Sequence, residues 1–283
     1  MKNQPNFQPE LTGVFGQPVW ENPTQTMVEA AYRHHNLHFR YLTIEVAPAD
    51  LGTAVAGARA MRFRGLNLTI PHKVAMMKHL DEIADSARAI GAVNVAVFNG
   101  ERLVGHNTDG KGFLESVQEL RDPEGARVFV IGAGGAARAI CVEFALAGAR
   151  SVTIVNRSAA RGEELVHHLN STTKTKSTFL PWSEAIAVPA DAEIVVNATS
   201  MGLYPDTDSP PLQFESLNGE MLVADVIHNP PWTPFLQRAA DRGCRTVDGL
   251  GMLVNQGRIG IQHWTGVFPD AEPMRKSLEA LFG

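Results

Sequence analysis

The sequence predicts an α/β protein of two domains, of which the second is built on a doubly wound parallel sheet. Its 283 residues suit two compact domains or one large one. From residue 127 onward, short apolar runs alternate regularly with helical stretches, a pattern typical of a parallel sheet with helices on its two faces. A hydrophobic content of 44% with 19% charged residues fits a globular protein.

Charge and hydropathy argue against several classes of partner. A formal net charge of -5 offers no basic surface for nucleic acid or an anionic membrane. No apolar stretch approaches the roughly 20 residues that cross a bilayer, and residues 1–10 lack the apolar core of a signal peptide. Cys141 and Cys244, like His34 and His35, lack metal-type spacing. We therefore expect a cytoplasmic monomer or homodimer that binds no metal and acts on a small molecule.

Short strands and helices make up the first part of the chain. We predict, in order, a strand and loop over 11–19, a helix over 26–35, a strand over 40–46, a helix over 49–63, a short strand before residue 71, and helices over 74–80 and 81–90. Gly91 is expected to end the last helix, because glycine readily adopts the left-handed conformation that closes many helices. Asn99-Gly100 separates two apolar runs and is the dipeptide most favoured at a tight hairpin turn.

The second part predicts a parallel sheet. We expect strands at 128–131, 152–155, 193–197, 222–226 and 245–247, with helices around 136–146, 160–169 and 234–242. The tail reads as two further helices, at 250–264 and 273–282, which we expect to return to the first domain.

A glycine-rich turn follows the first of these strands. The run 128–131 leads directly into Gly132-Ala133-Gly134-Gly135-Ala136-Ala137, which fits the pattern G-x-G-x-x-G/A. The first glycine permits a tight turn, the second lets the backbone approach a pyrophosphate, and the third small residue lets the helix pack closely on the sheet. N–H groups at the helix N-terminus then donate hydrogen bonds to the phosphates. We predict a Rossmann-type dinucleotide site formed by Gly132, Gly134, Gly135, Ala136 and Ala137.

The end of the second strand indicates which dinucleotide binds. An NAD site carries an acid there, which holds the ribose 2′-hydroxyl. This chain instead reads Asn156-Arg157-Ser158-Ala159-Ala160-Arg161, whose two arginines and serine hydroxyl suit a 2′-phosphate. The alternative is that Arg157 and Arg161 are ordinary surface charges. Given the glycine turn, we predict NADP as the cofactor, held here by Asn156, Arg157, Ser158 and Arg161.

Lys73 stands at a strand-to-helix junction that does not favour a cation. Pro71 favours the first helical turn, which puts Lys73 near a helix N-terminus, where the dipole opposes its charge by about 0.3–1 kcal/mol. A surface lysine is one interpretation. The motif Gly105-His106-Asn107-Thr108-Asp109-Gly110 favours another, in which Lys73 pairs with Asp109 and faces the cofactor, although Asp109 also reads as a helix N-cap. Asn94 is the one polar residue in the apolar run 92–98, so it is either a structural amide or a substrate contact.

With these motifs in order, the sequence resembles the shikimate dehydrogenase family. The shared strings are Asn67 to Lys73, Ile90-Gly91-Ala92-Val93-Asn94, Asn107-Thr108-Asp109-Gly110, Gly132 to Ala137, Asn197-Ala198-Thr199-Ser200-Met201-Gly202-Leu203, Asn229-Pro230, Asp248-Gly249-Leu250-Gly251-Met252-Leu253-Val254 and Gln256. They span nearly the whole chain. The resemblance implies a substrate-binding domain at 1–108 plus 249–283, an NADP-binding Rossmann domain at 109–248, and reversible reduction of 3-dehydroshikimate to shikimate.

The resemblance also implies roles for individual residues. Lys73 would deliver a proton to the developing alkoxide, and Asp109 would orient Lys73 and accept a hydrogen bond from a ring hydroxyl. Asn94 and Gln256 would bind ring hydroxyls. The resemblance also places Asn67 and Thr69 near the substrate. Four further residues would lie near the cofactor: Thr199, Met201, Val226 and Gly249.

Three positions depart from the family pattern, and all three belong to the groups expected to hold the substrate carboxylate. The usual Ser-x-Ser near the first helix is replaced by Asn22 and Thr24, and a tyrosine before Asn229-Pro230 is replaced by His228. Each replacement can still donate a hydrogen bond, so an acid can still bind, with altered geometry. One interpretation is neutral drift in a shikimate enzyme. The other is a paralogue acting on quinate, an aminoshikimate or another cyclic hydroxy acid.

Two hypotheses from other functional classes rank below the two dehydrogenase hypotheses. A non-catalytic NADP-binding sensor would keep the glycine turn and lose the proton-transfer pair, yet both Lys73 and Asp109 are present. A related dehydrogenase acting on a tRNA-linked substrate would need a basic surface, and one acting on a folate would be expected to carry different residues beside the strand ends.

Overall fold

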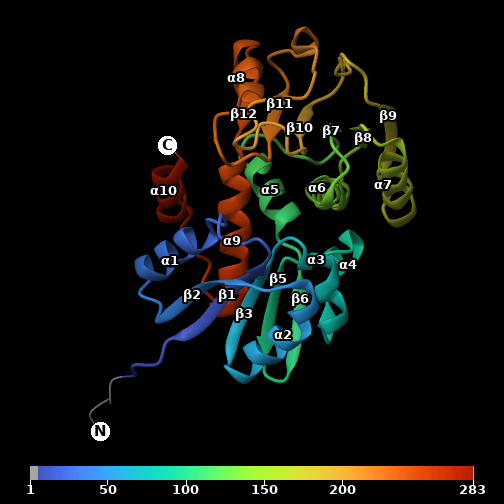
Figure 1. Ribbon diagram of the computed structural model, residues 1–283. Helices are drawn as coiled ribbons and strands as arrows, with labels where there is room; N and C mark the ends of the chain where they lie inside the picture. Colours follow the sequence, from blue (N-terminus) through green and yellow to red (C-terminus); the bar gives the residue numbers. More distant parts are fainter. Residues whose placement is uncertain (1–5, 283) are drawn as a thin grey trace. The chain divides into compact units, whose positions relative to one another are not determined.

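The computed structural model of the chain describes residues 6–282, which form two compact units (Figure 1). Unit 1 holds the residues up to Thr108 together with Gly257–Ala280. Unit 2 holds Asp109–Gln256 together with Leu281 and Phe282. The second division falls inside one continuous helix, α9 (Gly249–Thr265), whose first residue is the boundary predicted from the sequence.

Unit 1 is built on a mixed six-stranded sheet with the order β2-β1-β3-β5-β6-β4. Its strands are β1 (Glu10–Gly16), β2 (Phe39–Glu45), β3 (Phe63–Leu68), β4 (Glu82–Ile83), β5 (Val95–Asn99) and β6 (Arg102–His106). Strand β1 pairs in parallel with β2 and β3, whereas β5 runs antiparallel to both β3 and β6. The predicted hairpin at Asn99-Gly100 is confirmed, with Gly100 at φ 61°.

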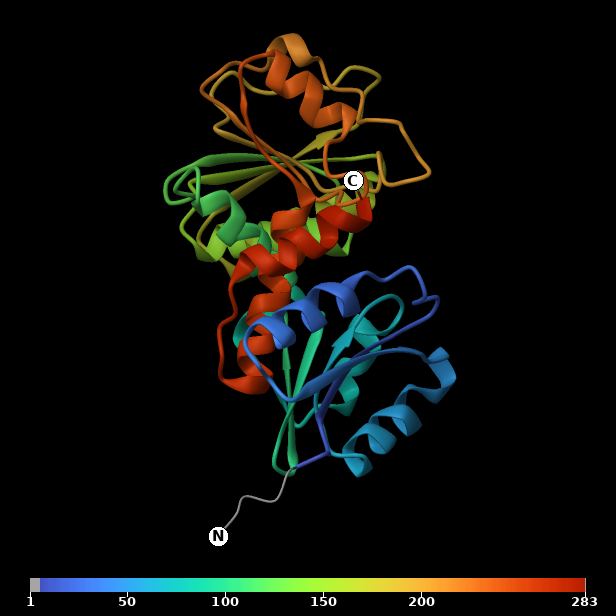
Figure 2. The same ribbon diagram turned by 90° about the vertical axis from the view of Figure 1, so that its left-hand side faces the viewer.

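The helices of unit 1 cover the two faces of this sheet. They are α1 (Thr24–His34), α2 (Leu51–Ala60), α3 (His72–Ala75), α4 (Asp85–Ile90), the end of α9 and most of α10 (Ala271–Phe282), with 3₁₀ turns at Pro48–Asp50 and Met76–His79. Figure 2 shows α2 on one face of the sheet and α1 with α9 on the other. Trp264 joins α9 to this second face, because its Nε1 donates to Ala96 O at 3.2 Å and its indole fills the space above Gly65.

Two predicted helices of unit 1 are shorter than expected. The helix predicted over 81–90 begins only at Asp85, because residues 82–83 pair with β6 as strand β4. Backbone and side chain of Asp81 both bond to Leu103, which draws this segment onto the sheet. The helix predicted over 49–63 ends at Ala60, since Arg62 adopts a left-handed φ of 60° and Phe63 enters β3. Gly91 closes α4 in the left-handed conformation, as predicted.

Unit 2 is a parallel six-stranded sheet with the order β12-β11-β10-β7-β8-β9. Its elements are α5 (Asp109–Gln118), β7 (Arg127–Ile131), α6 (Gly135–Leu146), β8 (Ser151–Asn156), α7 (Ala159–Thr172), β9 (Lys176–Pro181), β10 (Ile194–Asn197), a 3₁₀ turn at Phe214–Ser216, β11 (Leu222–Asp225), α8 (Pro234–Asp241), β12 (Arg245–Val247) and the start of α9. Figures 1 and 2 show α8 on one face of the sheet and α6 with α7 on the other. The predicted doubly wound α/β class is confirmed.

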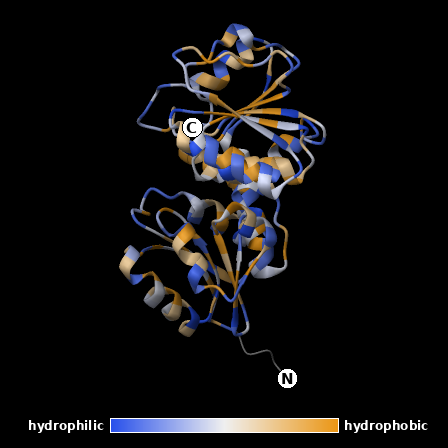
Figure 3. Cartoon of the chain, turned by 90° about the vertical axis from the view of Figure 1, so that its right-hand side faces the viewer, coloured by the Kyte–Doolittle hydropathy of each residue, from blue (hydrophilic) through white to orange (hydrophobic). Residues whose placement is uncertain are grey.

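The strand order of unit 2 reverses at β7, which has β8 on one side and β10 on the other. Ligands of open α/β sheets bind outside the carboxyl ends of the strands at such a reversal. The strands that meet there are apolar, as the colouring of Figure 3 shows, and their side chains are buried. Across the described residues 6–282, no helix combines the length and the apolar character needed to cross a membrane.

Candidate active site

Lys73 is the second residue of α3, and hydrogen bonds hold the backbone around it. His72 N donates to Thr69 O at 2.8 Å, and the buried imidazole of His72 donates through Nε2 to Val46 O at 2.8 Å. Lys73 O accepts from Val93 N at 2.9 Å. The lysine itself is half-buried, at the start of a four-residue helix. Its main chain is therefore fixed to the segment that leads into β5.

Asn94 links that segment to the end of β6. Its Oδ1 accepts from Thr108 N at 2.7 Å, and its Nδ2 donates to Thr108 Oγ1 at 3.0 Å. Asn107 adds a bond from Nδ2 to Ala92 O at 3.0 Å. Asn94 is thus a structural amide, one of the two roles predicted for it. A role of Asn94 in binding substrate stays a prediction.

Asn67 continues the same buried network. Tyr41 donates its hydroxyl to Asn67 Oδ1 at 2.6 Å, and Asn67 Nδ2 donates to Asn94 O at 3.1 Å. Burial raises the pKa of Tyr41 well above its usual value, so the phenol stays a hydrogen-bond donor. Sequence reasoning missed Tyr41, because no local pattern distinguishes it from other strand residues, and it gave no role to Thr108, although Thr108 belongs to the motif 107–110.

Asp109 is the first residue of α5 and of unit 2. Two glycines follow in this helix, and each lies against backbone of another helix. A Cβ on Gly110 would lie 2.4 Å from Ala139 O, and one on Gly112 would lie 2.4 Å from Gln256 N. The pairing of Asp109 with Lys73 of unit 1 remains a prediction.

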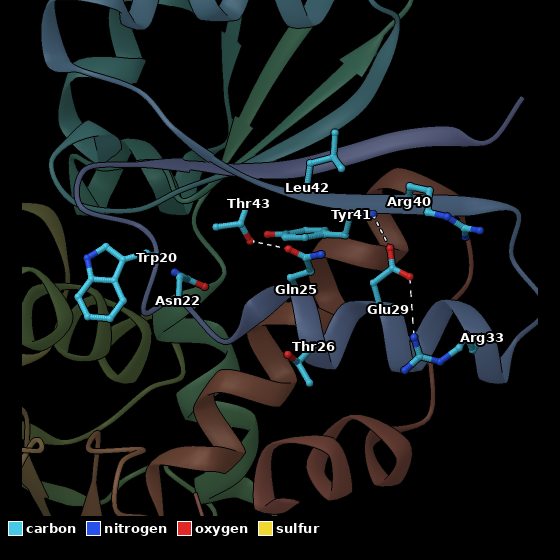
Figure 4. Close-up of a pocket in the computed structure, with 10 residues that line it drawn as sticks. All are labelled: Trp20, Asn22, Gln25, Thr26, Glu29, Arg33, Arg40, Tyr41, Leu42 and Thr43. Carbon is cyan, nitrogen blue, oxygen red and sulfur yellow. Dashed lines mark hydrogen bonds and ion pairs between the residues drawn. The ribbon is translucent and has the colours of Figure 1, made fainter. Parts of the chain in front are cut away.

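Asn22 and Thr24 stand at the start of α1. Asn22 Oδ1 accepts from Thr24 N at 3.0 Å, and the side chain of Thr24 is buried. Asn22 also lines an open groove of about 640 Å³ between α1 and β2, next to the exposed Trp20 and to Thr43 (Figure 4). The carboxamide of Asn22 therefore holds the backbone that leads into α1, while the N-cap of this helix is Pro23.

His228 and Gln256 belong to unit 2. Burial lowers the pKa of His228, so the imidazole is neutral near pH 7 and offers one donor and one acceptor. Its ring stands edge-on to Phe282, with centroids 5.6 Å apart. Gln256 is buried, and its Nε2 donates to Leu253 O at 2.9 Å.

The glycine turn after β7 has the shape that a dinucleotide requires. Gly132 has φ 121°, and a Cβ there would lie 2.7 Å from Ala198 O, so only glycine fits. A Cβ on Gly134 or Gly135 would meet no described atom within 4 Å, which leaves the side of the turn next to the α6 N-terminus open. Ala137 is fully buried against the sheet. These features fit the phosphates of a bound dinucleotide.

Residues 157–161, which follow β8, carry two arginines and one serine hydroxyl and no acidic residue. Ser158 Oγ accepts from Arg161 N at 3.4 Å as the N-cap of α7, and Asn156 Nδ2 donates to Ser158 O at 2.9 Å. The guanidinium of Arg157 lies 5.3 Å from the ring centroid of Trp182, a cation–π contact that sequence reasoning missed.

The remaining predicted cofactor positions follow β10, β11 and β12. Thr199 Oγ1 donates to Asn197 Oδ1 at 2.7 Å, and Met201 N donates to Thr199 Oγ1 at 3.1 Å. Val226 N donates to Asn197 O at 3.1 Å. Gly249 packs so closely that a Cβ would lie 2.2 Å from Ile227 O. The structure thus brings these positions together at the carboxyl ends of three neighbouring strands.

His34, His35 and Asp270 place their ligand atoms within 4.8 Å of one another, which their sequence spacing did not indicate. His34 Nε2 lies 3.1 Å from Asp270 Oδ2. Asp270 N donates to His35 Nε2 at 3.0 Å, so that lone pair of His35 is already used. This group joins α1 to the segment before α10 by hydrogen bonds.

Comparisons with known proteins cover nearly the whole chain. Family models described as the shikimate dehydrogenase substrate binding domain, shikimate / quinate 5-dehydrogenase, and the shikimate 5′-dehydrogenase C-terminal domain match residues 14–96, 115–210 and 249–279. A curated relative, shikimate dehydrogenase (NADP(+)) of Desulforamulus reducens, is 40% identical over 278 residues, which are 96% of each chain.

Two solved structures are especially similar. The ligand-free 5-ketofructose reductase of a Gluconobacter species is 49% identical, with a TM-score of 0.96, and the match covers 98% of this chain and 100% of that one. A shikimate dehydrogenase in complex with NADP+ is 33% identical, with a TM-score of 0.92, and the match covers 98% and 97%.

Proposed function

The chain belongs to the shikimate dehydrogenase family, as predicted, and from this premise we propose that it reduces a ring ketone reversibly with NADPH, 3-dehydroshikimate to shikimate being the first candidate. One observation in unit 1 carries the proposal. The bonds from Val93 to Lys73 and from Asn94 to Thr108 fix the backbone on both sides of a proposed proton-transfer pair, because Asp109 directly follows Thr108.

The residues after β7 and β8 would hold the cofactor. The open turn at Gly134 and Gly135 would receive the pyrophosphate, and Arg157, Ser158 and Arg161 would bind the 2′-phosphate. When bound, NADPH supplies the hydride. The relatives named as NADP(+)-dependent support this choice of cofactor.

Lys73 and Asp109 would manage the charge and the proton at the substrate. The Lys73 ammonium stabilises negative charge on the carbonyl oxygen and donates its Nζ proton to it, and the amine then regains a proton from solvent. Asp109 would orient Lys73 and accept a hydrogen bond from a ring hydroxyl. Asn67, Asn94 and Gln256 would hold ring hydroxyls.

A second candidate substrate is a neutral ketose such as 5-ketofructose. It is favoured by the 49% identity to a 5-ketofructose reductase, above the 40% to a shikimate dehydrogenase. The same choice is favoured by Asn22, Thr24 and His228, since 5-ketofructose has no carboxylate for them to bind.

Residues 1–108 with 249–283 are proposed to bind the substrate and 109–248 the cofactor, in a cytoplasmic monomer or homodimer.

The test is steady-state kinetics with NADPH and NADH on 3-dehydroshikimate and 5-ketofructose, and with NADP+ on shikimate and quinate. We expect turnover with at least one ketone and a clear preference for NADPH. If the change from Ser-x-Ser to Asn22 and Thr24 altered the substrate, replacing both residues by serine should raise kcat/KM for 3-dehydroshikimate relative to kcat/KM for 5-ketofructose. Binding of NADP+ without turnover on any of these compounds would support the sensor instead.

A further inference from the structure

Arg138 is a cation of the cofactor pocket that the sequence motifs did not single out. It lines a pocket of about 320 Å³ together with Gly134, Gly135, Arg161 and Glu164. The pocket lies within unit 2, between the glycine turn and the first turns of α7. The pocket therefore has one arginine on α6 and one on α7.

The position of Arg138 is costly for the protein without a ligand. It lies in the first turns of α6, where the helix dipole opposes a cation. Its Nε is buried and has no hydrogen-bond partner among the described residues. Nη1 lies 3.3 Å from Glu164 Oε1, but the carboxylate is 69% exposed, so this ion pair is weak. A buried guanidinium N–H without an acceptor is stabilised by any anion that enters the pocket.

We propose that Arg138 binds the 2′-phosphate of NADP(H), and that Glu164 holds Arg138 until this phosphate replaces it. The inference rests on the proposed use of NADP(H). Arg138 is tied to α7, the helix whose N-cap Ser158 and whose Arg161 are the predicted 2′-phosphate ligands. The pyrophosphate, in contrast, is served by backbone N–H groups of the glycine turn. A 2′-phosphate carries nearly two negative charges near pH 7, which Arg138 and Arg161 match from two sides of the pocket.

The test measures dissociation constants of NADP+ and NAD+ by calorimetry on the purified full chain. Arg138→Gln should weaken NADP+ binding by roughly tenfold to a hundredfold, the range of a lost hydrogen bond to a charged group. NAD+ binding should change by less than about twofold, because NAD+ lacks the phosphate. Equal losses for both cofactors would assign Arg138 to the pyrophosphate or to the fold, and unchanged NADP+ binding would also overturn the proposal.

Glu164→Gln provides a second test that leaves Arg138 in place. It should tighten NADP+ severalfold and leave NAD+ unchanged, because the competing carboxylate is gone. Glu163→Gln is the matched control, with the same change of charge on an adjacent exposed residue that does not line the pocket. An equal gain in the control would show a general field effect and contradict the role of Glu164.

The proposed function and this inference fail in different ways. If the wild-type chain does not bind NADP+, the premise itself is wrong. If the wild-type chain binds NADP+ but turns over no ketone, the catalytic proposal fails while the Arg138 measurements still stand. If binding is normal and Arg138→Gln binds NADP+ as tightly as wild type, only the inference is overturned.

Discussion

Asp225 is a buried carboxylate at the end of β11 in unit 2. Its Oδ2 accepts from Thr233 Oγ1 at 2.7 Å, and its Oδ1 accepts from Asn197 Nδ2 at 3.0 Å and from Ile227 N at 3.1 Å. Burial nevertheless raises the pKa of Asp225 from 3.8 to about 6, since desolvation of the anion outweighs these donors and the backbone N–H of Val226. The network connects Asp225 to Asn197, which in turn holds Thr199 at the proposed cofactor site.

This raised pKa predicts a loss of stability as the pH rises from about 4 to about 6. The folded state binds the proton of Asp225 more tightly than the unfolded state, so its contribution is fully present below about pH 4 and is lost through the folded pKa. The change is at most about 3 kcal/mol in the free energy of unfolding. His228, whose pKa is lowered, acts in the opposite direction, so the effect must be read as a difference between variants.

Urea unfolding of the wild type and of Asp225→Asn at several pH values isolates the contribution of Asp225 to the free energy of unfolding. The asparagine does not titrate, so the stability of the wild type relative to the variant should fall over this interval. A difference that is flat between pH 4 and pH 7 would show that Asp225 does not titrate there.

Single residues were predictable from the sequence where the local pattern conflicts with the residue type. Lys73 at a helix start and Asn94 in an apolar run both stood out for that reason. Tyr41 and Arg138 did not, because their partners Asn67 and Glu164 are distant in sequence and adjacent only in the fold. A buried hydrogen bond or an unpartnered N–H is a tertiary feature that no local pattern records.

Among the elements of unit 2, α5 depends on close helix packing. A Cβ on Gly112 would lie 2.4 Å from Gln256 N and 3.0 Å from Met252 O, both on the start of α9. Backbone atoms cannot move aside as a flexible side chain can. Gly57 in α2 is different, because the nearest atom to its Cβ would be Met61 Cε at 4.0 Å.

These two glycines predict opposite effects of one substitution. Gly112→Ala should destabilise the protein by about 1–3 kcal/mol, because overpacking outweighs the better helix propensity of alanine. Gly57→Ala should stabilise it by about 0.4–1 kcal/mol through the unfolded state. Thermal or urea unfolding measures both, and a stabilised Gly112→Ala would disprove the close approach of α5 and α9.

Elements were predictable where apolar runs are continuous. All five strands predicted for the second part are present. Four of them, β7, β8, β10 and β11, are interior strands of the parallel sheet, which are buried on both faces and read as apolar runs. The edge strand β9 was missed, since Lys176-Ser177-Thr178 begins it with polar residues. The helix α5 received no predicted range, although Asp109 indicated a possible helix N-cap, because its glycines, which its packing requires, weaken the helical signal.

At the scale of the whole molecule, the chain leaves unit 1 at Thr108 and re-enters it within α9. The residues proposed for catalysis come from both units, with Lys73 in unit 1 and Asp109 in unit 2. Family membership was predictable because motifs distributed over nearly the whole chain occur in the family order. Substrate choice was not, since Asn22, Thr24 and His228 change the groups available for a carboxylate without specifying what replaces it.

The proposed role of Lys73 as the proton donor in NADPH-dependent ketone reduction is tested by comparing kcat of the wild type and Lys73→Met on the preferred ketone. We predict that the variant loses roughly 10²- to 10⁴-fold in kcat, the range of general acid catalysis, while its dissociation constant for NADP+ is unchanged. The control Lys78→Met, an exposed lysine in the turn that follows α3, should retain wild-type kcat. A Lys73→Met variant with the kcat of the wild type would show that Lys73 is not the proton donor.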